Sequence, residues 1–565
     1  MNSRIPFIQT AGLEPWEKPI REALDAISRQ EIVRRIWAKD WTVWASHPAE
    51  IANRLGWLFS PWTMAERLPA LDVFARSVGS EGYTDVLLMG MGGSSLAPEV
   101  LSRVFPVKTG FLNLHILDST APEAVLEFDR NLDPATTLYI VSSKSGTTAE
   151  TAAFLNYFFV RVSSRLGEDK AGAHFCAITD PGTPLESLGR RIAFRTVFNG
   201  DPEIGGRFSA LSPFGLVPAA LMGIDIRKML EKAEGLARLC RENEAAANPG
   251  VFLGAVLGVL AASGRDKLTL ILPPRLHSLA AWIEQMVAES TGKRGKGILP
   301  VPGFWGPDQD VNEPCADRIL AEVCMANAPG DMPAREAGRM MAPSVRLVLE
   351  EEEALGAHFF LWEMATAVAG FVLGINPFDQ PNVELAKKKT REVLKAGLET
   401  PAGRAPAADF GDIRVLSDIP GPSVEESLRL FLKQARPGDY MSLQAFIAPS
   451  RDARDSLLAL QRAVWAKTGL AVTGDFGPRY LHSTGQLHKG DRGNGLFIQI
   501  AEEPVTDVPI PGIPGWPAPA ASFGTLIAAQ ARGDWMALRE MSRRILRLEM
   551  GKNAAAKMKE IASRL

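Results

Sequence analysis

Hydroxylated side chains cluster directly after a β-like stretch near residue 140. The segment 142–148 reads SSKSGTT; it follows the apolar run LYIV and precedes a helix-like segment, AETAAFLNYFF. Hydroxyls and backbone N–H groups at the start of a helix form a site for anions, and a glycine such as Gly146 lets the backbone approach the ligand closely. These residue types predict a phosphate-binding loop.

A second loop of the same kind follows an earlier predicted strand, TDVLLMG, and reads GMGGSS (90–95). Ligands bind at the carboxyl ends of strands in a parallel sheet, so the two loops could hold one phosphorylated molecule. A dinucleotide site is the alternative, because GMGGSS resembles G-x-G-x-x-G and Asp118 ends the next strand. However, Ser95 stands where the third glycine is expected, and Asp118 lies further from Gly90 than the usual spacing of about 20 residues. A phosphate-bearing small molecule is therefore favoured.

A candidate acid–base residue, Glu289, ends the predicted helix WIEQMVAES. A carboxylate at a helix C-terminus faces an unfavourable dipole, and in a cleft it would become more basic, which suits a general base. Gln285 lies one turn earlier on the same face. The alternative is an exposed glutamate with no chemical role.

A candidate cation, Arg207, follows two glycines in GGRFS (205–209). The glycines give the backbone freedom to project the guanidinium into a site, where it could stabilise a developing oxyanion. A structural turn with a surface arginine is the alternative.

The elements that must position these residues alternate between strand and helix from about residue 84, and a second series begins at LTLILPP (268–274). This alternation predicts parallel sheets with helices on both faces. A Pro/Gly/Ala-rich break, PAGRAPAADFGD (401–412), follows. After it comes a small α/β region ending in a helix, GDWMALREMSRRILRLEM, with a solvated arginine cluster. The predicted ranges are an N-terminal helical segment (1–70), two sheet domains (71–245 and 246–400) and an appendage with a terminal helix (412–565).

Composition describes an ordinary soluble protein: 565 residues, 46% hydrophobic, 22% charged, with a net charge of -3. This charge argues against a nucleic-acid partner. Four scattered cysteines without a CxxC pair fit a reducing compartment and predict neither disulfides nor a metal site. The N-terminus lacks the apolar core of a signal peptide, and the apolar runs 251–262 and 365–375 are too short to span a bilayer. We expect a cytoplasmic protein with no membrane partner.

Five stretches in this order resemble the glucose-6-phosphate isomerase family over most of residues 35–400. They are GMGGSSLAP (90–98), SKSGTTAET (143–151), GGRFSALSPFGL (205–216), AESTGK (288–293) and INPFDQPNVELAK (375–387). The tail LAVTGDFGPRYLHSTGQLHKG (470–490) resembles the branch in which a transaldolase is fused to the isomerase.

The resemblance implies two sugar-isomerase (SIS) domains, each a doubly wound flavodoxin-like sheet, and a homodimer. It implies interconversion of glucose 6-phosphate and fructose 6-phosphate through an enediolate, with no metal or organic cofactor. Glu289 would move the proton, Arg207 would stabilise the enediolate and Lys387 would help to open the sugar ring. The implied sugar-phosphate contacts, some only by their place in a matching motif, are Ser94, Ser143, Lys144, Ser145, Thr147, Thr148, Gln285 and Gln380.

One departure concerns the histidine with which the family opens the sugar ring. The segment after Glu289 has no histidine before His358, which lies on an apolar helix face and is expected to be a packed core residue. His482 and His488, in HSTGQLHK, are expected in a polar loop and are the candidate substitutes. The alternative for both is a solvent-exposed loop without a chemical role.

Two alternatives to the isomerase remain open at this point. A regulatory protein that only binds sugar phosphates would keep the hydroxylated loops but lose the base, whereas Glu289, Arg207 and Lys387 are all present. An isomerase of a related sugar phosphate, such as mannose 6-phosphate, would keep all of them.

Overall fold

The computed structural model describes residues 5–302, 316–326, 342–397 and 407–565, and these divide into two compact units. Unit 1 comprises residues 1–116, 136–146 and 173–379; unit 2 comprises residues 117–135, 147–172 and 380–565. Each unit is described by itself below. Cys315 and the first half of the predicted break at 401–412 lie outside the described residues. Each of the two units combines residues from more than one of the predicted domain ranges, so these ranges stay a prediction.

The first sheet of unit 1 has the strand order β3-β2-β4-β5-β6, and the pairs from β2 to β6 are parallel. Numbered along the chain, this order is 2-1-3-4-5, which is typical of a flavodoxin-like doubly wound sheet. The predicted fold class is confirmed. The strands are β2 (Asp85–Gly90), β3 (Asn113–Leu117), β4 (Thr137–Ser142), β5 (Phe175–Thr179) and β6 (Thr196–Asn199).

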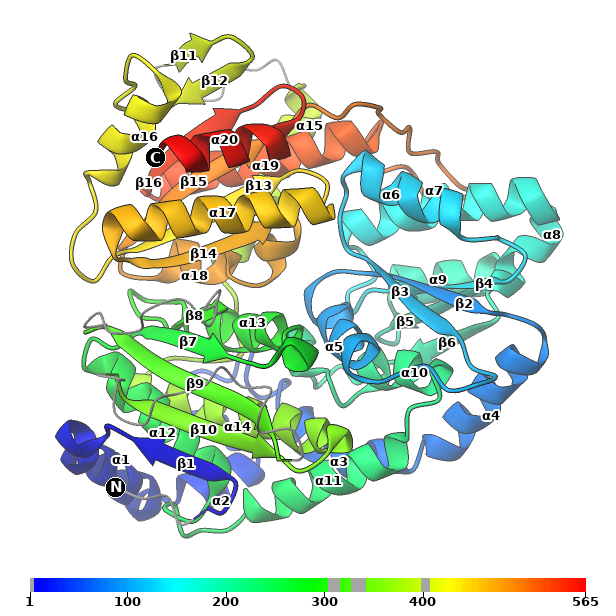
Figure 1. The fold of residues 1–565 in the computed structure, drawn as a ribbon. Helices are drawn as coiled ribbons and strands as arrows, with labels where there is room; N and C mark the ends of the chain where they lie inside the picture. Colours follow the sequence, from blue (N-terminus) through cyan, green and yellow to red (C-terminus); the bar gives the residue numbers. More distant parts are fainter. Residues whose placement is uncertain (1–4, 303–315, 327–341, 398–406) are drawn as a thin grey trace. The chain divides into compact units, whose positions relative to one another are not determined.

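The second sheet of unit 1 has the order β1-β10-β9-β7-β8 (Figure 1). Its strands β7 to β10 are parallel, whereas β1 pairs with β10 antiparallel at the edge, with Ile8 opposite Leu347. The N-terminal edge strand was not predicted, because four residues are too few to show a period. The strands are β1 (Ile8–Ala11), β7 (Lys267–Ile271), β8 (Leu299–Pro302), β9 (Arg318–Met325) and β10 (Ser344–Leu349).

Most helices of unit 1 contribute to one continuous apolar core. The predicted N-terminal helical segment (1–70) contains helices as well as the edge strand β1, and its limits as a domain stay a prediction. The helices are α1 (Glu17–Arg29), α2 (Ile32–Trp37), α3 (Ser60–Ala65), α4 (Leu68–Ser80), α5 (Leu96–Val104), α9 (Pro184–Arg191), α10 (Pro213–Leu221), α11 (Ile226–Leu239), α12 (Pro249–Ala262), α13 (Leu279–Thr291) and α14 (Leu355–Leu373).

Helix α14 is longer than its apolar run suggested. The helical stretch Glu352–Leu373 has 22 residues, and an 18-residue window within it has a mean hydropathy of 1.4, which is enough to cross a membrane by length and composition alone. The expectation that this run is too short was therefore wrong. However, 83% of its apolar window is buried inside the protein, where it packs on α12 as a core helix does.

Unit 2 is built on a third sheet with the order β11-β12-β16-β15-β13-β14. The strands β13 to β16 are parallel, with β14 and β15 on either side of β13, so the predicted appendage is a doubly wound sheet of its own. The strands are β11 (Ala407–Phe410), β12 (Ile413–Leu416), β13 (Tyr440–Phe446), β14 (Ala471–Phe476), β15 (Gly495–Ala501) and β16 (Arg544–Glu549).

The helices of unit 2 come from distant parts of the chain, since α6 and α7 pack with the C-terminal residues. They are α6 (Pro122–Asn131), α7 (Ala149–Leu166), α8 (Glu168–Ala171), α15 (Val383–Ala396), α16 (Val424–Leu432), α17 (Arg451–Thr468), α18 (Gly485–Gly490), α19 (Phe523–Glu540) and α20 (Ala554–Arg564).

The predicted terminal helix over residues 533–550 was wrong in its second half. Helix α19 ends at Glu540, and the residues RILRLE form β16 in the middle of the sheet. Its arginines are not a solvated face: Arg547 is 7% exposed, and Arg543 pairs with Asp491 at 3.0 Å. Only the last four residues of this segment, LRLE, alternate between apolar and polar, and so short a pattern is a weak strand signal.

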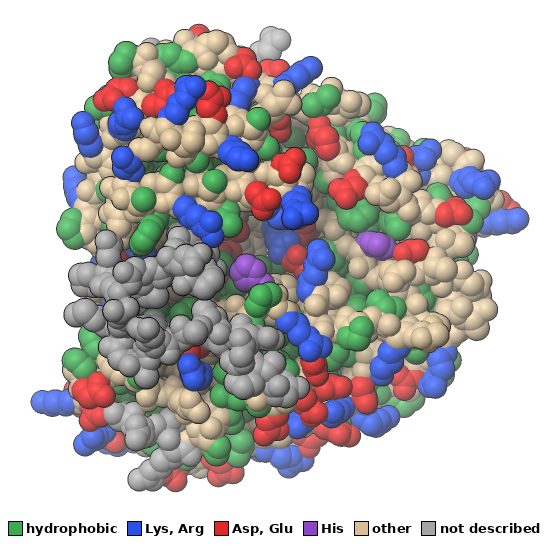
Figure 2. Space-filling view, in the orientation of Figure 1, with side chains coloured by type: hydrophobic (Ala, Val, Ile, Leu, Met, Phe, Trp, Pro, Cys, Tyr) green, Lys and Arg blue, Asp and Glu red, His purple; other side chains and the backbone are tan. Residues whose placement is uncertain are grey.

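The surface carries both signs of charge. Figure 2 shows acidic and basic side chains interspersed on the face in view, without one extended basic patch. This distribution agrees with the small net charge.

Candidate active site

The two hydroxylated loops meet at the carboxyl edge of the first sheet, as their positions after β2 and β4 predicted. The hydroxyl of Ser142 donates a hydrogen bond of 3.0 Å to the backbone carbonyl of Ser94. Ser94 and Ser143 are 9% and 3% exposed, whereas Ser145 and Thr147 are exposed and Thr148 is half-buried. Thr147 and Thr148 continue the loop into α7, whose helix proper begins at Ala149.

The first loop also touches the turn that carries Arg207. A Cβ atom on Gly93 would lie 2.0 Å from the carbonyl oxygen of Gly206, so only glycine allows this contact. The hydroxyl of Ser209 donates to the carbonyl of Gly93 at 3.2 Å. The loop predicted to bind phosphate is therefore fixed against the turn of the predicted catalytic cation.

Lys144 lies within the predicted phosphate loop but has partners of its own. Its ammonium forms an ion pair with Asp180 and donates to the carbonyl of Asp201 at 3.1 Å. These bonds tie the loop after β4 to the ends of the next two strands. In this state the lysine fixes the loop, and its predicted role as a substrate contact stays a prediction.

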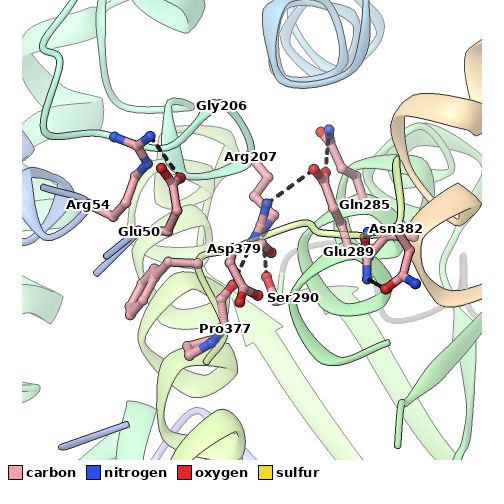
Figure 3. Close-up of polar contacts among 12 residues, drawn as sticks. Glu50, Arg54, Gly206, Arg207, Gln285, Glu289, Ser290, Pro377, Asp379 and Asn382 are labelled. Carbon is pink, nitrogen blue, oxygen red and sulfur yellow. Dashed lines mark hydrogen bonds and ion pairs between the residues drawn. The ribbon is translucent and has the colours of Figure 1, made fainter. Parts of the chain in front are cut away.

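Arg207 and Glu289 form a buried ion pair. Nη1 of Arg207 lies 3.1 Å from Oε1 of Glu289, and the two side chains are 2% and 9% exposed (Figure 3). Gln285, one turn earlier on α13, donates from Nε2 to the other carboxylate oxygen at 3.0 Å. The predicted base, cation and amide are thus in contact, and the alternatives of an exposed glutamate and a surface arginine are wrong.

The guanidinium of Arg207 is also held by groups that the sequence did not single out. Its Nε donates to the hydroxyl of Ser290 at 2.7 Å, and its Nη2 donates to the carbonyls of Pro377 and Asp379 at 2.6 and 3.1 Å. Burial lowers the pKa of this arginine, while Glu289 and Asp379 oppose the shift. An arginine remains a cation under these conditions because its ordinary pKa is so high.

A second buried cation, Lys293, lies beside Arg207. It is 2% exposed, and its ammonium contacts both the carbonyl and Oδ1 of Asp379, at 2.6 and 2.7 Å. Desolvation, reinforced by the charge of Arg207, lowers the pKa of Lys293 to about 8. Lys293 stands in the motif AESTGK and Asp379 in the motif INPFDQPNVELAK, but nothing in the sequence showed that these two residues pair.

In unit 2, His482 contacts a carboxylate rather than bulk solvent. Its Nε2 lies 3.0 Å from Oε1 of Glu150, which is buried in the first turn of α7. Burial alone would raise the pKa of Glu150, but the charge of His482 and its hydrogen bond outweigh burial and hold that pKa below its ordinary value. The sequence analysis missed Glu150, although it stands inside SKSGTTAET.

The expectation of a polar loop for the two histidines was wrong. His482 ends a short 3-10 helix (Arg479–His482), and His488 lies in α18 with 1% exposure. The ring of His488 packs against Tyr440, Tyr480 and Phe497, and burial lowers its pKa well below the ordinary value. This packing is typical of a core histidine, so the geometry favours His482 as the chemical group. His358 is also buried in α14, as predicted.

The remaining predicted residues of unit 2 lie at the surface. Lys387 is exposed on α15, pairs with Glu384 at 2.9 Å and is close enough to Glu150 to lower its pKa. Gln380 is exposed and begins the segment 380–565 of this unit. The roles predicted for both residues stay predictions.

Comparison with known proteins identifies the family. The phosphoglucose isomerase family model matches residues 75–297. A glucose-6-phosphate isomerase from Rubrobacter xylanophilus is 34% identical over 394 residues, which are 59% of this chain and 88% of that protein. The chain belongs to the phosphoglucose isomerase family. The resemblance noted from five motifs is therefore confirmed.

Further comparisons agree with this assignment. A glucose-6-phosphate isomerase from Thermus thermophilus is 31% identical over 421 residues, which are 66% of this chain and 97% of that protein. A solved structure of a hypothetical protein, also from Thermus thermophilus, is 29% identical, with a TM-score of 0.57, and covers 69% of this chain and all of its own. A glucose-6-phosphate isomerase structure from Chlamydia trachomatis, 19% identical with a TM-score of 0.58, shares the fold over 69% of this chain and 88% of its own.

Proposed function

We propose that this protein is a glucose-6-phosphate isomerase, which interconverts glucose 6-phosphate and fructose 6-phosphate through an enediolate. The observation that carries the proposal is the buried contact of Glu289 with Arg207 and Gln285. Proton transfer next to a carbonyl needs a base beside the carbon and a cation beside the oxygen that becomes negative. The contact supplies one of each.

In this proposal Glu289 removes the proton from C2 of the aldose and returns it to C1, while the carbonyl moves from C1 to C2. Arg207 stabilises the negative oxygen of the enediolate. Gln285 holds one carboxylate oxygen and so fixes the orientation of the group. The carboxylate takes the proton from C2 and gives it to C1, while a proton passes from O2 to O1, so the reaction is redox-neutral and needs no redox cofactor.

The phosphate of the substrate is assigned to the hydroxylated loops. Ser94, Ser143, Ser145, Thr147 and Thr148 precede helix starts, where hydroxyls and N–H groups favour an anion. The phosphate lies away from the reacting carbons, so its binding energy can orient the sugar for the transition state.

Ring opening is assigned to His482, with Lys387 as a second candidate. The hemiacetal hydroxyl loses a proton, the bond between the ring oxygen and the anomeric carbon breaks, and the ring oxygen gains a proton. A histidine next to a carboxylate can carry this proton, because the carboxylate stabilises the imidazolium that forms.

The finer predictions of a cytoplasmic location and a homodimer belong to the same proposal. The burial of most of the apolar window of α14 inside the protein supports a protein outside the membrane. Gel filtration coupled to light scattering tests the dimer. The measured molar mass should be about twice that of one 61.2 kDa chain.

The experiment for the function is an assay of fructose 6-phosphate conversion, in which a dehydrogenase detects glucose 6-phosphate. We expect turnover on the order of 10 s⁻¹ or more, which is typical of enzymes. Mannose 6-phosphate, tested in parallel, should be converted more slowly. Binding of fructose 6-phosphate without turnover would support the regulatory alternative and overturn the proposal. Preference for mannose 6-phosphate would reassign the substrate.

The pH dependence of this activity should report Lys293. Below about pH 8 its ammonium adds positive charge near Arg207, and above that pH the charge is lost, so kcat/KM should fall on the alkaline side. The variant Lys293→Arg should move this limb above about pH 10, because an arginine stays charged there. Lys293→Met, neutral at every pH, should be slow throughout and lack the limb. If kcat/KM of the wild type stays constant through about pH 8, the charge of Lys293 does not contribute to the reaction.

A further inference from the structure

A chain of hydrogen bonds runs from α19 to His482 within unit 2. Oε1 of Glu150 accepts from two donors, the ring Nε2 of His482 at 3.0 Å and the amide Nε2 of Gln530 at 2.7 Å. The other end of the amide, Oε1 of Gln530, accepts from the hydroxyl of Thr120 at 2.8 Å. The four residues come from the segment after β3, from α7, from α19 and from the 3-10 helix 479–482.

The chemistry of these groups fixes the direction of every bond in the chain. An ionised carboxylate only accepts, so Gln530 must turn its NH₂ toward Glu150 and its oxygen toward Thr120. Thr120 then must donate. The same rule requires a proton on Nε2 of His482, so in the neutral ring the lone pair lies on Nδ1.

Three of the four residues of the chain of hydrogen bonds are buried, whereas the side chain of His482 is 19% exposed. Thr120, Gln530 and Glu150 are 0%, 4% and 6% exposed. A hydrogen bond to a buried charge is among the stronger ones in proteins, and a carboxylate that loses a donor there must reorient or protonate. Gln530 therefore fixes Oε1 of Glu150, the same oxygen that accepts the hydrogen bond from the imidazole of His482.

Helix α19 also anchors the segment that carries His482. One turn after Gln530, Asp534 accepts from the hydroxyl of Tyr480 at 2.7 Å and pairs with Lys489 at 2.6 Å. Arg479, at the start of the same 3-10 helix, donates to Asp118 at 2.9 Å. The backbone around His482 is thus fixed independently of Gln530, which leaves the amide to set the ring.

We propose that Gln530, oriented by Thr120, is a positioning residue that selects the Nε2–H tautomer of His482 and so makes Nδ1 the nitrogen that moves the proton in ring opening. The inference rests on the proposed function for its kinetic consequence. The selection of the tautomer does not depend on it.

The direct test is the nitrogen chemical shifts of the histidine rings in the full-length protein labelled with ¹⁵N-histidine. The chain has 7 histidines, and the signals of His482 are assigned by their loss in His482→Gln. At a pH where the ring is neutral, wild type should show a single Nε2–H tautomer for His482. In Gln530→Met, which keeps the length of the side chain but removes both hydrogen bonds, the two tautomers should mix. An unchanged tautomer in this variant would overturn the proposal.

The kinetic test compares a closed-ring substrate with an open one. Fructose 6-phosphate must open before it reacts, whereas 5-deoxyfructose 6-phosphate lacks the hydroxyl that closes the ring. Gln530→Met should lower kcat/KM on the order of tenfold for the first and less than about twofold for the second, given the strength of a hydrogen bond to a charged group. An equal loss on both substrates, or no loss, would overturn the positioning role.

Matched variants separate positioning from a general loss of structure. Thr120→Val removes the hydroxyl that orients the amide and should follow Gln530→Met in direction, while Thr120→Ser keeps the hydroxyl and should restore both readouts. Gln461→Met replaces a buried glutamine on α17, outside the chain of hydrogen bonds, and should change neither. If wild type does not interconvert the two sugar phosphates, the proposed function fails, and the tautomer experiment still decides the inference about Gln530.

Discussion

Replacing Glu289 by glutamine should abolish turnover and leave sugar-phosphate binding nearly intact. The amide has the shape of the carboxylate, can keep one hydrogen bond to Arg207, and cannot take a proton from carbon. Loss of a general base alone costs about 10² to 10⁴ in rate. Because Glu289 is the carboxylate that lies directly against both the guanidinium and the amide of Gln285, we expect the upper end of that range.

The measurement combines the coupled assay with calorimetric binding of fructose 6-phosphate. The control is Glu284→Gln, which changes a second buried glutamate of α13, 3% exposed, that is not part of the ion pair with Arg207. It should keep activity within about threefold, as expected for a site outside the chemistry. If Glu289→Gln works as fast as wild type, the assignment of the base is wrong. If it loses binding as well as turnover, the carboxylate holds the substrate instead of acting as the base.

The residues of unit 1 that could be predicted share short-range signals. Gln285 and Glu289 are four apart on one helix, so their contact follows from the helical period. The two hydroxylated loops follow parallel strands, so they had to end at the same edge, and the bond from Ser142 to Ser94 is the result. In these cases local sequence together with strand direction determines the neighbours.

The partners that could not be predicted are joined across long stretches of chain. Arg207 reaches the carbonyl of Pro377 over 170 residues, and Gln530 reaches Glu150 over 380. A carbonyl has no side-chain signature, and no period relates α19 to α7. Such contacts depend on how helices pack, which one sequence does not display.

The strand β16 shows a different limit. Only its last four residues, LRLE, alternate as a strand does, and the strand follows the helical segment GDWMALRE with only a short turn between them. Arginine and leucine favour helices, so local propensity outweighed the alternation in the prediction. The structure instead places Arg547 opposite Gln499 in the sheet, where its guanidinium bonds to that amide and to Glu549.

Replacing Arg207 by lysine should lower kcat by about 10² to 10³, the usual cost of losing one donor to a developing oxyanion. The charge remains, but a single ammonium cannot contact Glu289, Ser290 and the carbonyl of Pro377 at the same time, as the guanidinium does (Figure 3). The turn that carries the side chain cannot move to compensate, because Gly206 is fixed against Gly93.

The control is Arg195→Lys, which alters another arginine of unit 1 that holds a carboxylate with both terminal nitrogens, Glu81, at a surface without predicted chemistry. It should leave kcat within about twofold, since exposed pairs contribute little. Thermal unfolding of both variants distinguishes a structural role of Arg207 from a catalytic one. A lysine variant that is less stable but turns over at the wild-type rate would make Arg207 a structural tie between loops. A variant that stays folded and turns over slowly, with KM little changed, would place the lost interaction in the transition state, where an enediolate needs it.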